Sequence, residues 1–161
     1  MNKLASDILK LTAALILCFL AAYLGQVFTG PAIPTWYAGL QKPIFSPPNW
    51  LFGPVWTLLY ALMAVSAFLV WREDGKDQEI KLALKIFVIQ LILNSLWSLA
   101  FFGLRSPLLG LIVIVALWAA ILLTIKNFLR ISALAGWLML PYLLWVSFAS
   151  VLNFSIFILN L

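Results

Sequence analysis

Charged residues divide this chain into five long uncharged intervals. The intervals are 31, 29, 19, 20 and 31 residues long and cover residues 11–41, 43–71, 86–104, 106–125 and 131–161. About 20 apolar residues in a helix cross a hydrocarbon core about 30 Å thick. We therefore expect an all-α integral membrane protein, a single domain over residues 1–161 built as a bundle of five transmembrane helices. The predicted helices cover about 6–28, 50–71, 79–102, 107–127 and 132–158.

Two prolines bear on where these helices end or bend. Gly30-Pro31 should stop the first helix, because proline lacks the N–H that would continue it. Pro141 lies inside the fifth apolar interval and should kink the helix there. The hydrophilic stretch 72–81 is the expected connection between the second and third helices and holds four of the five acids.

The composition also indicates a membrane protein, and this changes how the net charge is interpreted. The chain is 65% apolar and only 9% charged, whereas a soluble domain is about 25% charged. A net charge of +5 therefore indicates membrane topology and not a nucleic-acid partner. Five helices place the termini on opposite sides, and only Lys42 and Arg105 then fall on the C-terminal side. The other eight basic residues are on the N-terminal side: Lys3, Lys10, Arg72, Lys76, Lys81, Lys85, Lys126 and Arg130. By the positive-inside rule the N-terminus should be cytoplasmic and the C-terminus outside.

The connection between the first two helices is unusually rich in proline and tryptophan. It holds a single charge, Lys42, and the segment around it contains Trp36, Trp50 and Trp56 with Pro43, Pro47, Pro48 and Pro54. So many prolines exclude a continuous helix, and so many rings do not suit a solvated linker. We expect a stiff aromatic loop that folds over an apolar part of the bundle.

Several kinds of chemistry are absent from the spans. The chain has no histidine, no acid in any membrane interval and a single cysteine, Cys18. This composition argues against a metal site, a Ser–His–Asp triad, paired catalytic carboxylates and the intramembrane charges of ion-coupled transporters. Function should therefore rest on aromatic, apolar and neutral polar side chains, with no cofactor required.

Neutral polar residues and rings recur at helical spacing in three of the predicted helices. In the third helix, Gln90, Asn94, Trp97, Ser98 and Phe101 share one face, which must point into the bundle because an unpaired amide is costly in lipid. This face is either a hydrogen-bonded clamp between helices or the wall of a ligand pocket with Asn94 as its polar contact, and the two are compatible. Similar stripes occur in the second and fifth helices: Trp56 and Tyr60, and Tyr142, Trp145, Ala149 and Asn153. Together they predict an apolar pocket with a few polar contacts.

Five motifs, in this order and spacing, resemble the translocator protein family, also called the tryptophan-rich sensory protein or peripheral benzodiazepine receptor family. They are WYAGLQKP, SPPNW, PVWTLLYALM, QLILNSLWSLAFFG and PYLLWVSFASVLN, and they cover almost the whole chain. The resemblance implies a five-helix membrane fold, a homodimer, and a pocket closed by the loop after the first helix. Its implied ligands are porphyrins such as protoporphyrin IX, and drugs of the benzodiazepine type. The implied ligand-binding residues are Trp36, Tyr37, Pro47, Trp56, Asn94, Trp97, Trp145 and Ala149.

The resemblance leaves three functions to weigh. The first is a receptor or sensor that binds a tetrapyrrole from the membrane lipid and regulates its level or movement. The second is an enzyme that breaks down porphyrin in light through Trp56 and Trp145, and the third is a facilitated transporter. The cholesterol-recognition pattern of animal members is missing here, since Phe154 follows Asn153 and no basic residue lies beyond Arg130. That absence argues against animal-type sterol trafficking. The short tail, the single cysteine and the charge distribution favour a bacterial origin, so we expect a bacterial cell membrane.

One further pattern bears on self-association. Ala14, Cys18 and Ala22 form a line of small residues at four-residue spacing in the first helix, with Ala21 and Gly25 beside it. Such lines let helices approach closely. The pattern favours a homodimer.

Overall fold

Five apolar helical spans form the part of the chain that the computed structural model describes, residues 2–75 and 77–161. The spans are Lys3–Ala32, Asn49–Trp71, Asp77–Gly103, Pro107–Ile131 and Ala133–Leu159, each long and apolar enough to cross a membrane. At most 44% of the apolar window of any span is buried, so the outer surface is suited to lipid. The expected five-helix membrane bundle is confirmed, and the chain is an integral multi-pass membrane protein.

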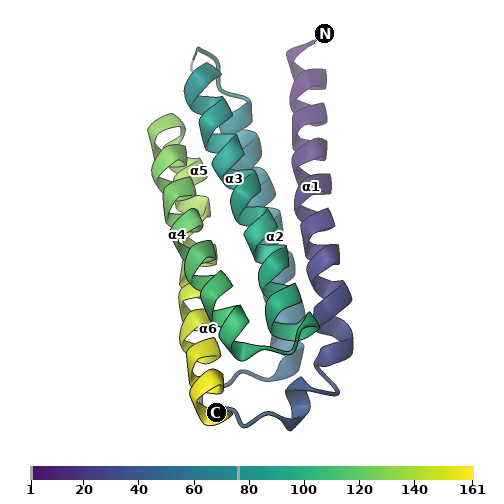
Figure 1. The fold of residues 1–161 in the computed structure, drawn as a ribbon. Helices are drawn as coiled ribbons and strands as arrows, with labels where there is room; N and C mark the ends of the chain where they lie inside the picture. Colours follow the sequence, from purple (N-terminus) through teal and green to yellow (C-terminus); the bar gives the residue numbers. More distant parts are fainter. Residues whose placement is uncertain (1, 76) are drawn as a thin grey trace.

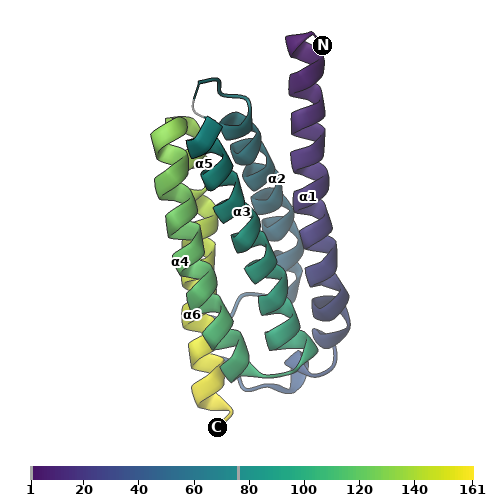
Figure 2. The ribbon, with the colours of Figure 1, turned by 45° about the horizontal axis from the view of Figure 1, so that its top comes forward.

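The long helices are α1 (Lys3–Ala32), α2 (Phe52–Trp71), α3 (Asp77–Ser98), α4 (Pro107–Ile131) and α6 (Leu140–Leu159), with the short α5 (Ala133–Leu138) before α6. Two 3₁₀ turns, η1 (Tyr37–Gly39) and η2 (Asn49–Leu51), flank the loop, and a π-helical turn, η3 (Leu99–Gly103), ends the third span. Helix α1 packs on α2 and α3, α4 packs on α3 and α6, and α5 packs on α2. These contacts close the spans into a ring with the chain termini at opposite ends (Figures 1 and 2).

Both ends of α1 and the C-terminal end of α4 differ from the predicted bounds. Helix α1 continues through Pro31 to Ala32, because a proline in a last turn removes only one hydrogen bond and its fixed φ suits a helix. It also begins earlier than predicted, since the Asn2 side chain accepts a hydrogen bond from the Leu4 backbone N–H. Helix α4 likewise runs four residues beyond the predicted end, to Ile131.

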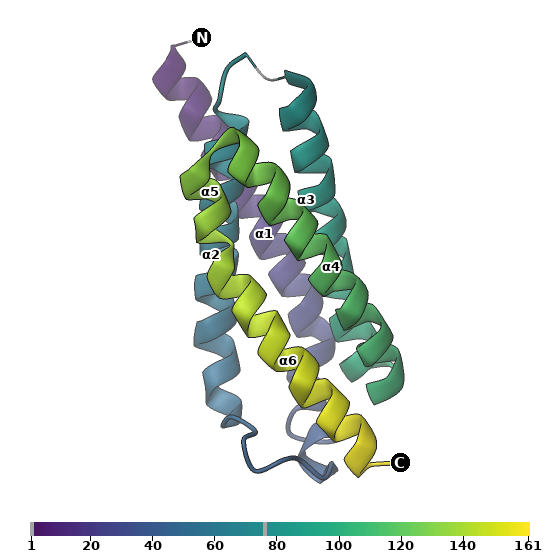
Figure 3. The same cartoon turned by 90° about the vertical axis from the view of Figure 1, so that its left-hand side faces the viewer.

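The kink expected at Pro141 is confirmed. The fifth span is interrupted at Met139, between α5 and α6, and Figure 3 shows α6 leaving α5 at an angle. Pro141 has no N–H to bond to the carbonyl one turn earlier, so the helix turns at this point. The bend lets α5 pack on α2 while α6 diverges from it toward the loop end.

The small-residue line of α1 packs inside the chain. Ala14, Cys18, Ala21 and Gly25 are buried, and a Cβ on Gly25 would lie 3.1 Å from the Ser98 hydroxyl oxygen of α3. These residues therefore bring α1 close to its neighbours within one copy. Self-association stays a prediction.

The basic residues divide between the two ends of the bundle. Seven of the eight predicted for the N-terminal end lie on helix ends or turns that meet there (Figure 1), and the eighth, Lys76, lies outside the described residues. Lys42 and Arg105 lie at the other end, in the loop and in the turn before α4. Below, the two ends are called the N-terminal end and the loop end.

Candidate functional site

A cavity of about 650 Å³ opens between α1, α2 and α3 at the loop end. Helix α1 and the residue after it contribute Phe19, Ala22, Tyr23, Gly25, Gln26, Thr29 and Ile33. The second span contributes Asn49, Trp50, Phe52, Gly53, Trp56, Thr57 and Tyr60. The third span contributes Asn94, Trp97, Ser98 and Phe102. The lining is mainly apolar and aromatic and contains no charged residue.

A chain of hydrogen bonds at the cavity wall joins three helices. The Tyr60 hydroxyl donates to Asn94 Oδ1 at 2.7 Å, and Asn94 Nδ2 donates to the Tyr142 hydroxyl at 2.7 Å. All three side chains are buried. Asn94 therefore ties α3 to α2 and α6 and also lines the cavity. Its role as a polar contact for a ligand stays a prediction.

A second chain of hydrogen bonds positions Trp97. Its Nε1–H donates to Asn153 Oδ1 of α6 at 3.2 Å, and Asn153 Nδ2 donates to the Pro107 carbonyl oxygen at 2.8 Å. The Trp97 ring stacks on Phe101, with ring centroids 5.6 Å apart. These contacts fix the plane of one indole in the cavity wall.

The π-helical turn η3 supplies the aromatic base of this wall. The Leu104 N–H donates to the Leu99 carbonyl oxygen five residues earlier, at 2.7 Å. Phe101 and Phe102 in this turn make an edge-to-face contact, with ring centroids 4.8 Å apart. Such turns are frequent at functional sites.

The loop lies over these rings and is tied down at two points. Tyr37 is 2% exposed, and its ring contacts Phe52, Phe101 and Phe102. Burial raises the pKa of the Tyr37 phenol, so this group stays neutral at physiological pH. Lys42 Nζ donates to the carbonyl oxygens of Tyr37 at 2.7 Å and Leu40 at 2.9 Å.

The second tie joins the loop to the C-terminal end of α6. The Gln41 backbone N–H donates to Asn160 Oδ1 at 3.0 Å, and Asn160 Nδ2 donates to the Gln41 carbonyl oxygen at 2.9 Å. The Asn160 amide thus pairs with the loop as another backbone segment would. The loop is an ordered cover fastened to the bundle.

The eight predicted ligand-binding residues fall into two groups. Trp56, Asn94 and Trp97 line the cavity. The other five, Trp36, Tyr37, Pro47, Trp145 and Ala149, do not. Phe52 lies between the two groups. It lines the cavity, and its ring makes edge-to-face contacts with Tyr37 and Trp145, with ring centroids 6.5 Å and 6.1 Å apart.

Sequence reasoning missed most of the polar lining near the mouth. Gln26 and Thr29 on α1 and Asn49 at the start of the second span all face the cavity. An amide inside an apolar first helix was a usable signal for Gln26, because lipid disfavours an unpaired amide. Tyr60 lies on the stripe of the second helix but is not among the eight predicted ligand-binding residues. Among the described residues no group of three His, Cys, Asp or Glu side chains could hold a metal ion.

Comparison with known proteins identifies the family. The model of the TspO/MBR family matches residues 14–159. The tryptophan-rich protein TspO of Archaeoglobus fulgidus is 48% identical over 96% of this chain and 99% of its own length. The protein of the same name from Chlorobaculum tepidum is 45% identical over 99% of both chains. The human translocator protein is 36% identical over 85% of this chain and 82% of its own. The match over nearly the whole chain, together with the five-helix bundle, shows that this chain belongs to the TspO/MBR family.

Proposed function

We propose that this protein is a membrane receptor for a flat, largely apolar tetrapyrrole such as protoporphyrin IX. It would hold the molecule in the cavity between α1, α2 and α3 and regulate its level or movement. The observation that carries the proposal is the pair of indoles, Trp56 and Trp97, on the wall of a 650 Å³ cavity whose polar contacts are neutral. Membership of a family whose relatives include a tryptophan-rich sensory protein supports a sensing role.

The dimensions and lining of the cavity suit such a ligand. Small-molecule sites have volumes of about 300–1,000 Å³ and combine apolar walls with a few polar contacts. Indole rings stack on flat conjugated molecules. The amide of Gln26 and the hydroxyl of Thr29 lie toward the loop end, where they would meet the carboxylates of a porphyrin whose ring enters the bundle.

A porphyrin titration with a tryptophan variant tests this proposal. Protoporphyrin IX added in the dark should quench the protein's fluorescence saturably. Trp56→Ala should weaken binding by about tenfold, because one stacking surface worth about 1.4 kcal/mol is lost. Trp137→Ala is the matched control, since Trp137 is 62% exposed on α5 and does not line the cavity. Equal affinity in wild type and Trp56→Ala would refute this site.

Light-driven breakdown of the porphyrin is a second candidate, and the position of Trp56 favours it. Trp56 lines the cavity, whereas Trp145 is separated from it by Phe52. If the protein is such an enzyme, illumination should change the spectrum of the bound porphyrin, and Trp56→Phe should slow the change more than Trp145→Phe. A stable spectrum under illumination leaves the receptor as the function.

We propose further that the N-terminal end faces the cytoplasm of a bacterial cell, because the basic residues gather there. A reporter enzyme that is active only outside the cytoplasm should be active when fused after Leu161. The same reporter inserted in the α2–α3 turn, after Gly75, should be inactive. The reverse pattern would show the opposite topology.

A further inference from the structure

The cavity opens sideways, between two membrane spans. Two large, exposed side chains line it on facing helices: Tyr23 on α1 is 66% exposed, and Trp50 of the second span is 72% exposed. Gly53 and Thr57, also exposed, continue the same edge along α2. All four residues lie within apolar spans. The mouth of the cavity is therefore positioned toward lipid.

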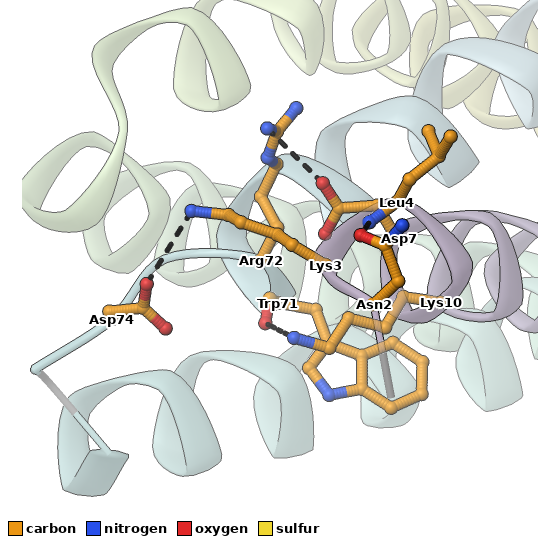
Figure 4. Close-up of polar contacts among 8 residues, drawn as sticks. All are labelled: Asn2, Lys3, Leu4, Asp7, Lys10, Trp71, Arg72 and Asp74. Atoms are coloured by element: carbon orange, nitrogen blue, oxygen red, sulfur yellow. Dashed lines mark hydrogen bonds and ion pairs between the residues drawn. The ribbon is translucent and has the colours of Figure 1, made fainter.

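Polar contacts in the described part of the chain hold α1 and α2 together at the N-terminal end. Asp7 Oδ2 lies 3.3 Å from Arg72 Nη2, and Lys10 Nζ donates to the Trp71 carbonyl oxygen at 3.1 Å. Figure 4 shows these contacts joining the start of α1 to the end of α2. Within the described residues, no hydrogen bond or ion pair joins the second half of α1 to the first half of the second span. The two helices are thus joined by polar contacts at the N-terminal end, and the cavity lies between them toward the loop end.

The loop covers another side of the bundle and takes no part in the cavity. None of residues 34–48 lines the cavity. The buried Tyr37 ring and the paired bonds between Asn160 and Gln41 hold the loop on the bundle, and Lys42 bonds to backbone carbonyls within the loop. A ligand arriving through the loop would have to break these contacts, whereas one arriving between α1 and α2 would not.

We propose that the ligand passes between the cavity and the lipid through this opening, between Tyr23 on α1 and Gly53 and Thr57 on α2. The inference rests on the proposed function and narrows its ligand class to molecules that reach the protein dissolved in the membrane. A flat apolar body would enter first between the two helices. Its polar edge would follow, toward Gln26, Thr29 and Asn49 at the loop end of the mouth.

Narrowing the opening tests the proposal. A Cβ on Gly53 would meet no atom within 4 Å, so Gly53→Trp should fold and place an indole at the mouth. With protein in lipid nanodiscs and protoporphyrin IX supplied in vesicles, stopped-flow quenching gives the association and dissociation rates. Both rates should fall by about fivefold or more, because an obstructed passage slows movement in each direction. Gly39→Trp, at a loop glycine with equally open surroundings and no part in the cavity, should leave both rates unchanged.

Whether the dissociation rate falls or rises in Gly53→Trp distinguishes an obstructed passage from a weakened binding site. A substitution that merely removes ligand contacts speeds dissociation, so faster dissociation in Gly53→Trp would overturn the lateral route. Unchanged rates in a variant that binds normally would overturn it as well. Absence of saturable quenching in the wild-type protein would instead overturn the proposed function itself.

Two further variants test the route without filling the opening. Tyr23→Ala removes an exposed ring from the mouth and should speed both association and dissociation. Asn160→Ala releases the loop from α6 and should leave both rates unchanged, because the ligand does not pass beneath the loop. Faster exchange in Asn160→Ala with no change in Tyr23→Ala would place the route through the loop and overturn the proposal.

Discussion

Replacing Asn94 by leucine should lower the free energy of unfolding by about 1–3 kcal/mol, the cost of leaving buried polar groups without partners. The substitution keeps the approximate volume of the side chain but removes the acceptor for Tyr60 and the donor for Tyr142. Both side chains are buried in the bundle, so each hydroxyl would be left without this partner. Unfolding in mixed micelles with increasing denaturing detergent, followed by tryptophan fluorescence, measures the change.

Removing the partners as well should restore part of this stability. In the triple variant Asn94→Leu, Tyr60→Phe, Tyr142→Phe, no hydroxyl remains unpaired, and apolar replacement of a whole buried network is often nearly neutral. The triple variant should therefore be more stable than Asn94→Leu alone. If Asn94→Leu unfolds at the wild-type detergent concentration, these hydrogen bonds contribute nothing measurable to the bundle.

The same triple variant separates the two interpretations of Asn94. If this residue acts only as a clamp between helices, the triple variant should recover porphyrin affinity together with stability. If its amide is also a contact for the ligand, affinity should stay low while stability recovers. The cavity lining, which includes both Asn94 and Tyr60, favours the second result.

The fold could be predicted from the sequence because charge is so costly inside a bilayer. Each interval between charges had to contain one span, which set the number and order of the helices. The exact helix ends were harder to predict from the sequence, since they depend on single contacts such as the Asn2 cap of α1. Pro141 was informative because a missing N–H has the same consequence in any helix.

The site was only partly predictable, because a stripe on a helix does not say which neighbour it faces. Trp56, Asn94 and Trp97 line one cavity, but Trp145, on an equally convincing stripe, packs against Phe52. Phe52 stands in an apolar run with nothing to mark it, yet its ring separates the cavity from the loop side of the bundle. Only the packing of α2 against the loop and α6 reveals that role.

A second substitution with a large expected effect is Gly110→Ala on α4, which should lower the free energy of unfolding by about 1–3 kcal/mol through overpacking. A Cβ there would lie 2.8 Å from Phe101 Cδ2 and 2.9 Å from Asn153 Oδ1. Helix propensity alone predicts the opposite sign, a gain of about 0.5–1 kcal/mol for alanine over glycine. The same detergent titration measures the difference, and Gly53→Ala, with no atom within 4 Å of its Cβ, is the matched control.

The consequence of Gly110→Ala should reach the cavity through Asn153. The Asn153 oxygen that the new methyl group would displace is the one that accepts the hydrogen bond from Trp97 Nε1. Trp97 would lose the contact that fixes its ring plane, so porphyrin affinity should fall along with stability even though Gly110 does not line the cavity. Gly53→Ala should keep full stability, and equal unfolding of the two glycine variants would show that the bundle relaxes around position 110. A loss of stability with unchanged affinity would instead show that the Trp97 ring is held in place by Phe101 stacking alone.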